Sequence, residues 1–335
     1  MATVVNAQTI HAELHRLREL QSEGGGPGTV AATSTLVAYA ARPSAWERIA
    51  EAARRIAIAH AARLLLLDAA GHASPHVTSF CGREGSETIC CEEVTIPLEA
   101  GSPDSSLALV EELLLPGLPA HLWWNGAGID GRLFAGLRAL VKRIVVDSSQ
   151  ADADAGGLVE LERALERRPH AHLSDLAWLR VGPWREMAAR LFDDPEHAAR
   201  LAHLEAIEIV SGTRGEAALL AGWLGVQLGF DVPAGSGAFA TPAGGRVTFA
   251  YARGGEPGEV RSVRLRTAGM AFTAAVESGG TSVSLSRESG RETRTRCEPL
   301  VTHSPEDRVS KALYGPDSDP AFAPSLAMAA RLVSA

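Results

Sequence analysis

The stretch Ser174-Asp-Leu-Ala-Trp-Leu-Arg-Val-Gly-Pro-Trp-Arg-Glu186 lies near the middle of the 335-residue chain and decides the local fold there. Ser174 or Asp175 can cap a helix, because a short side chain with an oxygen accepts hydrogen bonds from first-turn amides. Proline lacks a backbone N–H and clashes with the preceding turn, so Gly182-Pro183 predicts a kink or a joint between two helices. The apolar residues around it recur at roughly helical spacing, namely Leu176, Leu179, Met187 and Leu191.

The same stretch holds two of the six tryptophans, Trp178 and Trp184, with Arg180 and Arg185 beside them. One interpretation is a kinked helix whose indole rings fill a core. The other is a surface that binds a partner, because tryptophan and arginine dominate the energy of protein interfaces. The sequence leaves both open, and the stretch contains no nucleophile, metal cage or phosphate-binding loop.

The residues before this stretch follow the pattern of a layered α/β fold. A strand over 35–39, a helix over 44–61 and a continuously apolar strand over 64–68 predict a β-α-β unit. The alternation continues with helices over 105–115 and 130–140 and strands over 121–125 and 143–147. We therefore expect an N-terminal domain, residues 1–155, with a mostly parallel sheet flanked by helices and a leading helix over 7–22.

A hairpin with strands over 75–80 and 88–98 is expected within this domain. The alternation slips between Cys91 and Val94, which predicts a β-bulge. The four cysteines, Cys81, Cys90, Cys91 and Cys297, show no zinc-binding spacing. We expect them to be free and reduced, as is usual in a cytoplasmic protein, and we assign them no redox control.

The composition of residues 150–157 is that of a linker, so a second domain is expected over 156–335. Short strands joined by glycine-rich turns predict an α+β domain with an antiparallel meander. Its expected helices cover 158–167, 195–203, 214–229, 305–313 and 320–334, and its expected strands cover 205–211, 246–252, 260–267, 270–277 and 281–287. Arginines make the meander locally basic, which indicates a solvated sheet face or, alternatively, a surface for an anionic ligand or acidic partner.

Charge and hydropathy exclude several broad functions. The formal net charge is −8, which disfavours a general role in binding nucleic acid. No apolar run approaches the roughly 18 residues that span a bilayer, and the N-terminus shows no signal-peptide pattern. We expect a cytoplasmic protein that binds neither nucleic acid nor membrane.

Polar residues end three of the expected parallel strands, at Asp68, Asn125 and Asp147. Ligands of such sheets favour the carboxyl ends of strands, so a crevice for a small molecule is one hypothesis. However, the chain contains no G-x-G-x-x-G or GKS/GKT loop, no G-x-S-x-G elbow and no metal-binding histidine motif among its eleven histidines. We therefore assign no catalytic residue, metal or cofactor.

Three runs resemble motifs of the glucose-6-phosphate dehydrogenase assembly protein family, OpcA. The run from Asp175 to Arg185 is similar to the family's signature, Leu118-Pro-Ala-His-Leu-Trp-Trp124 to its Pro-x-x-x-Trp-Trp strand, and Lys142-Arg-Ile-Val-Val-Asp-Ser-Ser149 to its Arg-(apolar)-Asp-Ser strand end. The runs stand in the family's order. The resemblance covers about residues 30–230 and is weaker after Ala240.

The resemblance implies a non-catalytic assembly factor that binds glucose-6-phosphate dehydrogenase and favours its active oligomer, in the oxidative pentose phosphate pathway. The residues it marks for partner binding are Asp175, Trp178, Arg180, Trp184, Arg185, Trp123, Trp124 and Asp147. The alternative is an enzyme that binds a sugar phosphate or nucleotide at the strand ends, since such folds host many functions.

Overall fold

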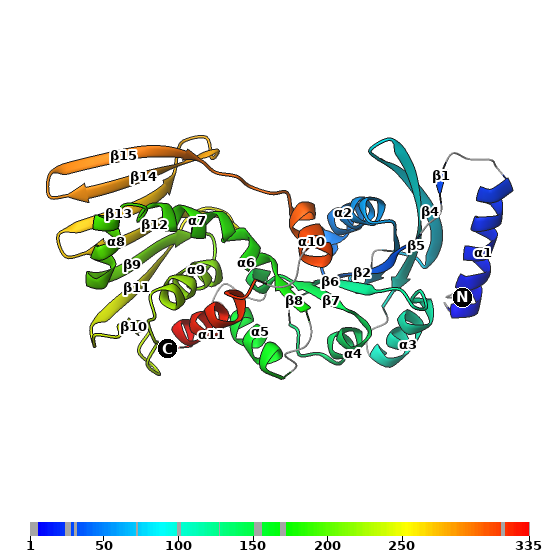
Figure 1. Ribbon diagram of the computed structural model, residues 1–335. Helices are drawn as coiled ribbons and strands as arrows, with labels where there is room; N and C mark the ends of the chain where they lie inside the picture. Colours follow the sequence, from blue (N-terminus) through cyan, green and yellow to red (C-terminus); the bar gives the residue numbers. More distant parts are fainter. Residues whose placement is uncertain are drawn as a thin grey trace. The chain divides into compact units, whose positions relative to one another are not determined.

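A computed structural model describes residues 6–23, 28–29, 32–71, 73–98, 102–126, 128–150, 156–167, 172–315 and 319–334. They form two compact units, each built on its own sheet (Figure 1). The first unit comprises Met1–Val146, His170–Ser174 and Ser304–Asp317, and the second comprises Asp147–Pro169, Asp175–His303 and Ser318–Ala335. The chain thus leaves the first unit after Val146 and returns to it twice.

The first unit has a mostly parallel sheet, which confirms the α/β prediction. Its strands follow the order β1-β5-β3-β2-β6-β7-β8, and β4 pairs with β5 in antiparallel fashion. The pairs β1–β5, β5–β3, β3–β2, β2–β6 and β6–β7 are parallel. The bounds are β1 Gly28–Thr29, β2 Ser34–Ala40, β3 Ala62–Asp68, β4 His76–Glu84, β5 Glu87–Pro97, β6 Ala120–Asn125, β7 Arg143–Val146 and β8 His172–Asp175.

Helices cover this sheet, so the central strand β3 is buried along its whole length, as its continuous apolar run predicts. Helix α2 packs against β2, β3, β4 and β5. The helices are α1 Ala7–Glu23, α2 Trp46–Ala59, preceded by the 3-10 turn Pro43–Ala45, α3 Pro103–Leu113, α4 Arg132–Leu140 and α10 Pro305–Tyr314. Helix α3 begins at Pro103 with Ser102 as its N-cap residue, earlier than the expected start at Ser105 or Ser106, because proline fits the first turn of a helix.

Helix α10 belongs to the first unit although it lies near the end of the sequence. The Tyr314 ring stacks on His60 at 3.7 Å between ring centroids and meets His121 edge-on at 4.8 Å. The His60 Nε2 atom lies 2.6 Å from Ser310 Oγ. Burial and the nearby positive charges of Arg143 and Lys142 lower the pKa of His121 to about 4. The aromatic cluster therefore holds neutral imidazoles against α10.

The predicted β-bulge in the hairpin is wrong. Strands β4 and β5 pair in continuous register from His76↔Thr95 to Glu84↔Glu87. The alternation slips for another reason: Glu92 and Glu93 are both buried, on opposite faces of β5. Arg63 and Arg18 bind Glu92, with N···O distances of 2.8 and 2.5 Å, and Arg54 binds Glu93 at 2.6 Å. Ion pairing thus permits charged residues where the pattern requires apolar ones.

The prediction that all cysteines are free is also wrong. Cys81 on β4 and Cys90 on β5 form a disulfide, while Cys91 is a buried thiol and Cys297 an exposed one. The two bonded residues are directly paired in the hairpin register, with Cα atoms 4.0 Å apart. The strand pairing therefore brings together two cysteines that their spacing in the sequence does not link.

The second unit has a mixed seven-stranded sheet in the order β10-β11-β9-β12-β13-β14-β15, in which β12, β13, β14 and β15 form an antiparallel meander. The strand expected over 246–252 is present as β11 but pairs with β9 rather than with the meander. Among the described strands of this sheet, β11 and β9 pair in parallel and the other pairs are antiparallel. The bounds are β9 Leu204–Ser211, β10 Ala238–Ala240, β11 Arg246–Arg253, β12 Val260–Thr267, β13 Met270–Val276, β14 Ser282–Ser289 and β15 Glu292–Pro299.

The predicted joint at Gly182-Pro183 is confirmed in the second unit, because α6 ends at Arg180 and α7 begins at Gly182. Helices α9 and α11 lie side by side in this unit (Figure 1). The helices are α5 Gly156–Arg167, α6 Leu176–Arg180, α7 Gly182–Arg190, α8 Pro195–Arg200, α9 Arg214–Gln227 and α11 Phe322–Val333, with 3-10 turns over Ser148–Gln150 and Leu201–His203.

Candidate functional site

The signature stretch builds a buried ionic network in the second unit, centred on Arg180 at the end of α6. The guanidinium donates to both carboxylate oxygens of Asp147, at 2.6 and 3.1 Å, and to Ser149 Oγ at 2.6 Å. Its Nε donates to Glu216 Oε1 at 2.8 Å. The structure thus joins Arg180 and Asp147, two of the residues marked from the sequence, and adds Glu216, which was not among the marked residues.

Glu216 ties this network to two further segments. It lies in the first turn of α9 and is fully buried. Its Oε2 accepts hydrogen bonds from Thr213 Oγ1 at 3.1 Å and from the Gly258 amide at 3.2 Å. Thr213 caps α9 and stands three residues before Glu216, the spacing of a capping box, which is the signal that could have found this pair.

The network fixes the charge states of its members. Burial alone would raise the pKa of Asp147, but the charge and hydrogen bonds of Arg180, with bonds from Ser149 and Gln150, hold that pKa below its ordinary value. Burial opposes the charge of Arg180 too, yet the carboxylates of Asp147 and Glu216 raise its pKa further. One guanidinium is therefore locked between two carboxylates in a site with little solvent.

Asp175 caps α6 in the same region, as the sequence predicts. Its fully buried carboxylate accepts from the amide of Ser148 at 2.9 Å, from the hydroxyl of Ser148 at 2.7 Å and from the amide of Ala177 at 3.2 Å. Burial and the nearby charge of Asp147 raise the pKa of Asp175 to about 6. The strand-end run Asp147-Ser148-Ser149 and the signature stretch are therefore two halves of one structure.

Trp178 and Arg185 form a second contact, with Asp319 in the turn before α11. The Arg185 guanidinium carbon lies 3.7 Å from the centre of the Trp178 ring, and Arg185 Nη1 binds Asp319 Oδ2 at 2.8 Å. Trp178 Nε1 donates to the same Asp319 oxygen at 3.2 Å. Asp319 lies 134 residues from Arg185, and no local pattern predicts it.

The marked tryptophans lie in the interior of their units. Trp178 and Trp184 are 3% and 4% exposed in the second unit, and Trp123 and Trp124 are each 5% exposed on β6 of the first. Trp124 stacks on Tyr39 at 3.7 Å between ring centroids. These exposures favour the core interpretation, because a ring already packed against its own chain offers little area to another protein.

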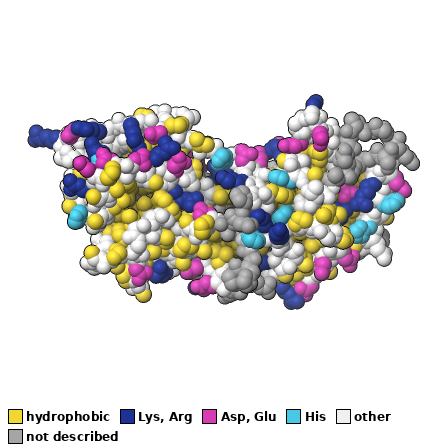
Figure 2. Space-filling model, viewed as in Figure 1, with side chains coloured by type: hydrophobic (Ala, Val, Ile, Leu, Met, Phe, Trp, Pro, Cys, Tyr) yellow, Lys and Arg dark blue, Asp and Glu magenta, His cyan; other side chains and the backbone are white. Residues whose placement is uncertain are grey.

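The arginines of the meander do not form a basic patch. Arg264 binds Glu288 at 2.9 Å, and Arg266 lies 3.6 Å from Glu205 and from Glu208. Figure 2 shows basic and acidic side chains interspersed in the region where β14 and β15 lie. This pairing leaves the sheet face nearly neutral. The local positive charge inferred from the sequence counted the arginines but not their acidic partners.

The structure gives little support to the hypothesis of a ligand-binding crevice at the ends of the parallel strands. Asp68 accepts from the amides of its own following turn, Ala70 and Ala73, and Asp147 binds Arg180. Asn125 is buried, and its Oδ1 has no hydrogen-bond partner among the described residues. No group of three or more histidine, cysteine, aspartate or glutamate side chains in the described ranges is placed to hold a metal ion.

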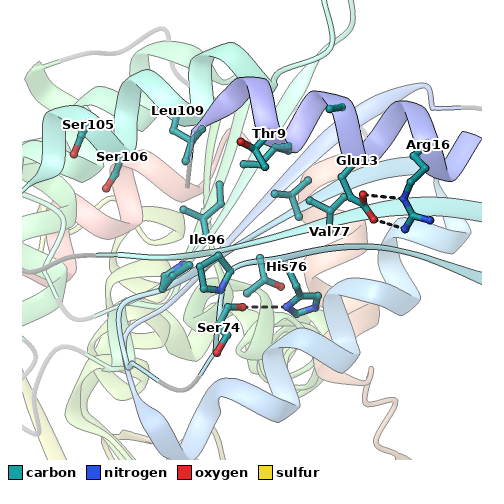
Figure 3. Close-up of a pocket in the computed structure, with 16 residues that line it drawn as sticks. Thr9, Glu13, Arg16, Ser74, His76, Val77, Ile96, Ser105, Ser106 and Leu109 are labelled. Atoms are coloured by element: carbon teal, nitrogen blue, oxygen red, sulfur yellow. Dashed lines mark hydrogen bonds and ion pairs between the residues drawn. The ribbon is translucent and has the colours of Figure 1, made fainter. Parts of the chain in front are cut away.

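A pocket of about 1280 Å³ lies elsewhere in the first unit, between α1, α3 and the β4–β5 pair (Figure 3). Val77 and Ile96 form its apolar floor, and the Glu13–Arg16 ion pair of α1 lies on its rim (Figure 3). None of the three strand-end residues lines it. Helices of the length and apolar character needed to cross a membrane are absent from the described part of the chain.

Comparison with known proteins connects this architecture to one family. Residues 53–163 match the family model described as glucose-6-phosphate dehydrogenase subunit N-terminal domain, and residues 171–326 match its C-terminal counterpart. The OxPP cycle protein OpcA of Nostoc punctiforme is 30% identical over 158 residues, and that of Synechocystis sp. is 32% identical over 143 residues. These alignments cover 45% and 42% of the chain and 34% and 30% of the relatives, so the chain spans only about a third of the relatives' length.

Among solved structures, the aldose-aldose oxidoreductase from Caulobacter crescentus complexed with glycerol gives a TM-score of 0.43 at 10% identity, over 83% of this chain and 87% of that one. This likeness is too low to inform fold or function. The two family models, in contrast, cover most of the chain, including the run through Asp147 and the signature that together build the network around Arg180. The chain therefore belongs to the OpcA family of glucose-6-phosphate dehydrogenase-associated proteins.

Proposed function

We propose that this protein binds glucose-6-phosphate dehydrogenase and favours its active oligomer, without catalysing a reaction itself. The observation that carries the proposal is the family match over residues 53–163 and 171–326. An activator of this kind must bind the active form of its partner more tightly than the inactive form. A difference of about 1–3 kcal/mol in binding free energy already shifts the equilibrium by roughly 5- to 150-fold.

In this proposal, most of the residues marked for partner binding do not contact the partner themselves. They hold the α6–α7 segment, whose surface makes the contact. Asp147, Asp175 and Arg180 fix the start of the α6–α7 segment, and the segment's own Trp178 and Trp184 are buried in the second unit. Arg185 is the most exposed of the marked side chains that form ion pairs, at 17%, and its guanidinium carbon is held 3.7 Å from the centre of the Trp178 ring. A guanidinium held in one orientation loses little entropy on binding, which suits a contact residue.

The test measures the activity of glucose-6-phosphate dehydrogenase from the same organism with and without this protein, together with size-exclusion chromatography and light scattering. We expect higher activity and a joint, heavier peak. Two folded proteins that neither form a joint peak nor change activity would contradict the proposal.

Arg185→Ala then locates the contact, because it should weaken complex formation without unfolding the protein. Arg48→Ala, which removes an exposed arginine from α2, serves as the matched control and should bind like the unmodified protein. Equal binding by both variants would remove Arg185 from the contact while leaving the assembly role in place.

A further inference from the structure

Within the described part of the chain, one face of the seven-stranded sheet in the second unit is open. The contacts that residues 190–197 make with β13, β14 and β15 all reach the other face, where Phe192 and His197 pack on Phe272 at 4.8 and 5.4 Å between ring centroids. Strand pairing places only small side chains on the open face of the strand β13, namely Ala271, Thr273 and Ala275, with Ser262, Ser284 and Ser286 beside them on β12 and β14. The small side chains make the middle of this face flat.

The charges on this face are balanced and arranged in rows. The strand β9 contributes Glu208, β12 contributes Arg264 and Arg266, and β14 contributes Glu288. Acidic, basic and acidic strands therefore succeed one another, with β13 lying between the last two. A strongly acidic or strongly basic partner would meet like charges on at least one row, which costs free energy.

We propose that this face is an interface between two copies of the chain, related by a two-fold axis that runs along β13. Such an axis places β12 of one copy opposite β14 of the other, and it keeps facing residues at the same height along the strands. Arg266, Ala271 and Glu288 stand at one level in the register. The axis therefore sets Arg266 of each copy opposite Glu288 of the other, so the charge pattern is complementary to itself.

The residues on the axis fit this packing. Ala271, Thr273 and Ala275 allow two sheets to approach to the usual separation of about 10 Å.

The axis along β13 brings five strands of each copy face to face, from β9 to β15 in the sheet order. At a spacing of about 4.8 Å and a length of about eight residues at about 3.3 Å each, they span roughly 600 Å², somewhat less than a standard interface. A standard interface buries about 800 Å² on each partner. This self-association is independent of the assembly role proposed above, since neither requires the other.

Sedimentation velocity and light scattering of the full chain over a range of concentrations test the proposal. We expect a mass approaching twice the 35.2 kDa of one chain. Thr273→Arg places two like charges on the axis and should shift the protein to the monomer. Arg266→Glu, at an exposed position, should weaken dimerisation at least tenfold, and adding Glu288→Arg should restore much of it.

Arg294→Glu is the matched control, because it reverses an exposed charge on the opposite face of β15 and should leave the dimer intact. Circular dichroism checks that each variant is folded. A monomer at every concentration, or a dimer that survives both Thr273→Arg and Arg266→Glu, would overturn the proposal. A monomeric protein whose Thr273→Arg variant loses the joint peak with glucose-6-phosphate dehydrogenase would also overturn it, and would assign the face to that enzyme.

Discussion

The second unit contains two sets of arginine–carboxylate pairs that differ in their surroundings. Arg180 is buried between Asp147 and Glu216, whereas Arg264 and Arg266 lie on an open sheet face among Glu205, Glu208 and Glu288. The chemistry of the pairs is the same, but the cost of breaking them is not. Water replaces a lost partner on the sheet face, while nothing replaces Arg180 in the interior. Pairing stabilises little by itself, and its removal destabilises strongly only where solvent is excluded.

The largest expected effect is that of Arg180→Ala. This change leaves the buried carboxylates of Asp147 and Glu216 without a counter-ion, which should lower the free energy of unfolding by about 3–5 kcal/mol. Chemical denaturation followed by circular dichroism measures it. A loss below about 1 kcal/mol would show that water reaches the network, and the distinction between the two arginine sets would then disappear.

The next effect is a dependence of stability on pH that comes from His121 in the first unit. Its pKa is lowered to about 4 in the folded protein, against 6.5 when unfolded, because burial and nearby positive charges disfavour the imidazolium. The stabilisation is therefore complete above pH 6.5 and is lost as the pH falls toward 4, by up to about 3 kcal/mol. Thermal unfolding across that range measures the loss.

Asp175 opposes this trend, because its pKa is raised to about 6 and its protonation favours the folded state at low pH. His121→Gln is the control that separates the two groups, since it should remove the His121 slope and leave that of Asp175. An unchanged slope in this variant would assign the pH dependence to other residues.

Reduction of the Cys81–Cys90 disulfide should have a somewhat smaller effect. The bond closes a short loop, with nine residues of separation, so its loss is expected to cost about 2–3 kcal/mol by the chain-entropy model. Unfolding with and without a reductant measures this cost. Cys81→Ser should match the reduced protein and become insensitive to reductant; continued sensitivity would point to a different cysteine pairing.

The smallest effect is expected for Arg294→Ala on β15. Its partner Glu292 lies 2.9 Å away, but both side chains are about two-thirds exposed, at 69% and 66%. Such pairs contribute roughly 0–0.5 kcal/mol, and that contribution is screened by salt. Chemical denaturation at low and high salt checks it. A loss comparable to that of Arg180→Ala would mean that solvent exposure does not set the cost of breaking these pairs.

Local patterns predicted the features that depend on neighbouring residues. Gly182-Pro183 predicted the joint between α6 and α7, and the apolar run 64–68 predicted the fully buried β3. The strand β15 was missed, because Glu292–Pro299 is exposed on both faces and shows no apolar alternation. Propensity and periodicity report burial, so a strand without a buried face leaves no signal.

Partners that are distant in sequence could not be predicted. Arg180 meets Asp147 and Glu216, 33 and 36 residues away, and Arg185 meets Asp319. The resemblance marked Arg180 and Asp147 but did not pair them. The sequence marked the tryptophans as candidates, but a sequence pattern cannot distinguish a tryptophan buried in the core from one exposed for binding a partner.

The return of α10 to the first unit has a consequence for how the protein is made. Ser304–Asp317 is contributed to that unit only after almost the entire chain has been synthesised. When all the strands of the eight-stranded sheet have been synthesised, the first unit still lacks Tyr314, whose ring packs against His60 and His121. Domains usually fold as units in order of synthesis. Truncation before residue 304 removes α10 from the first unit as well as α11 from the second, so the loss of the last residues also damages the part of the protein made first.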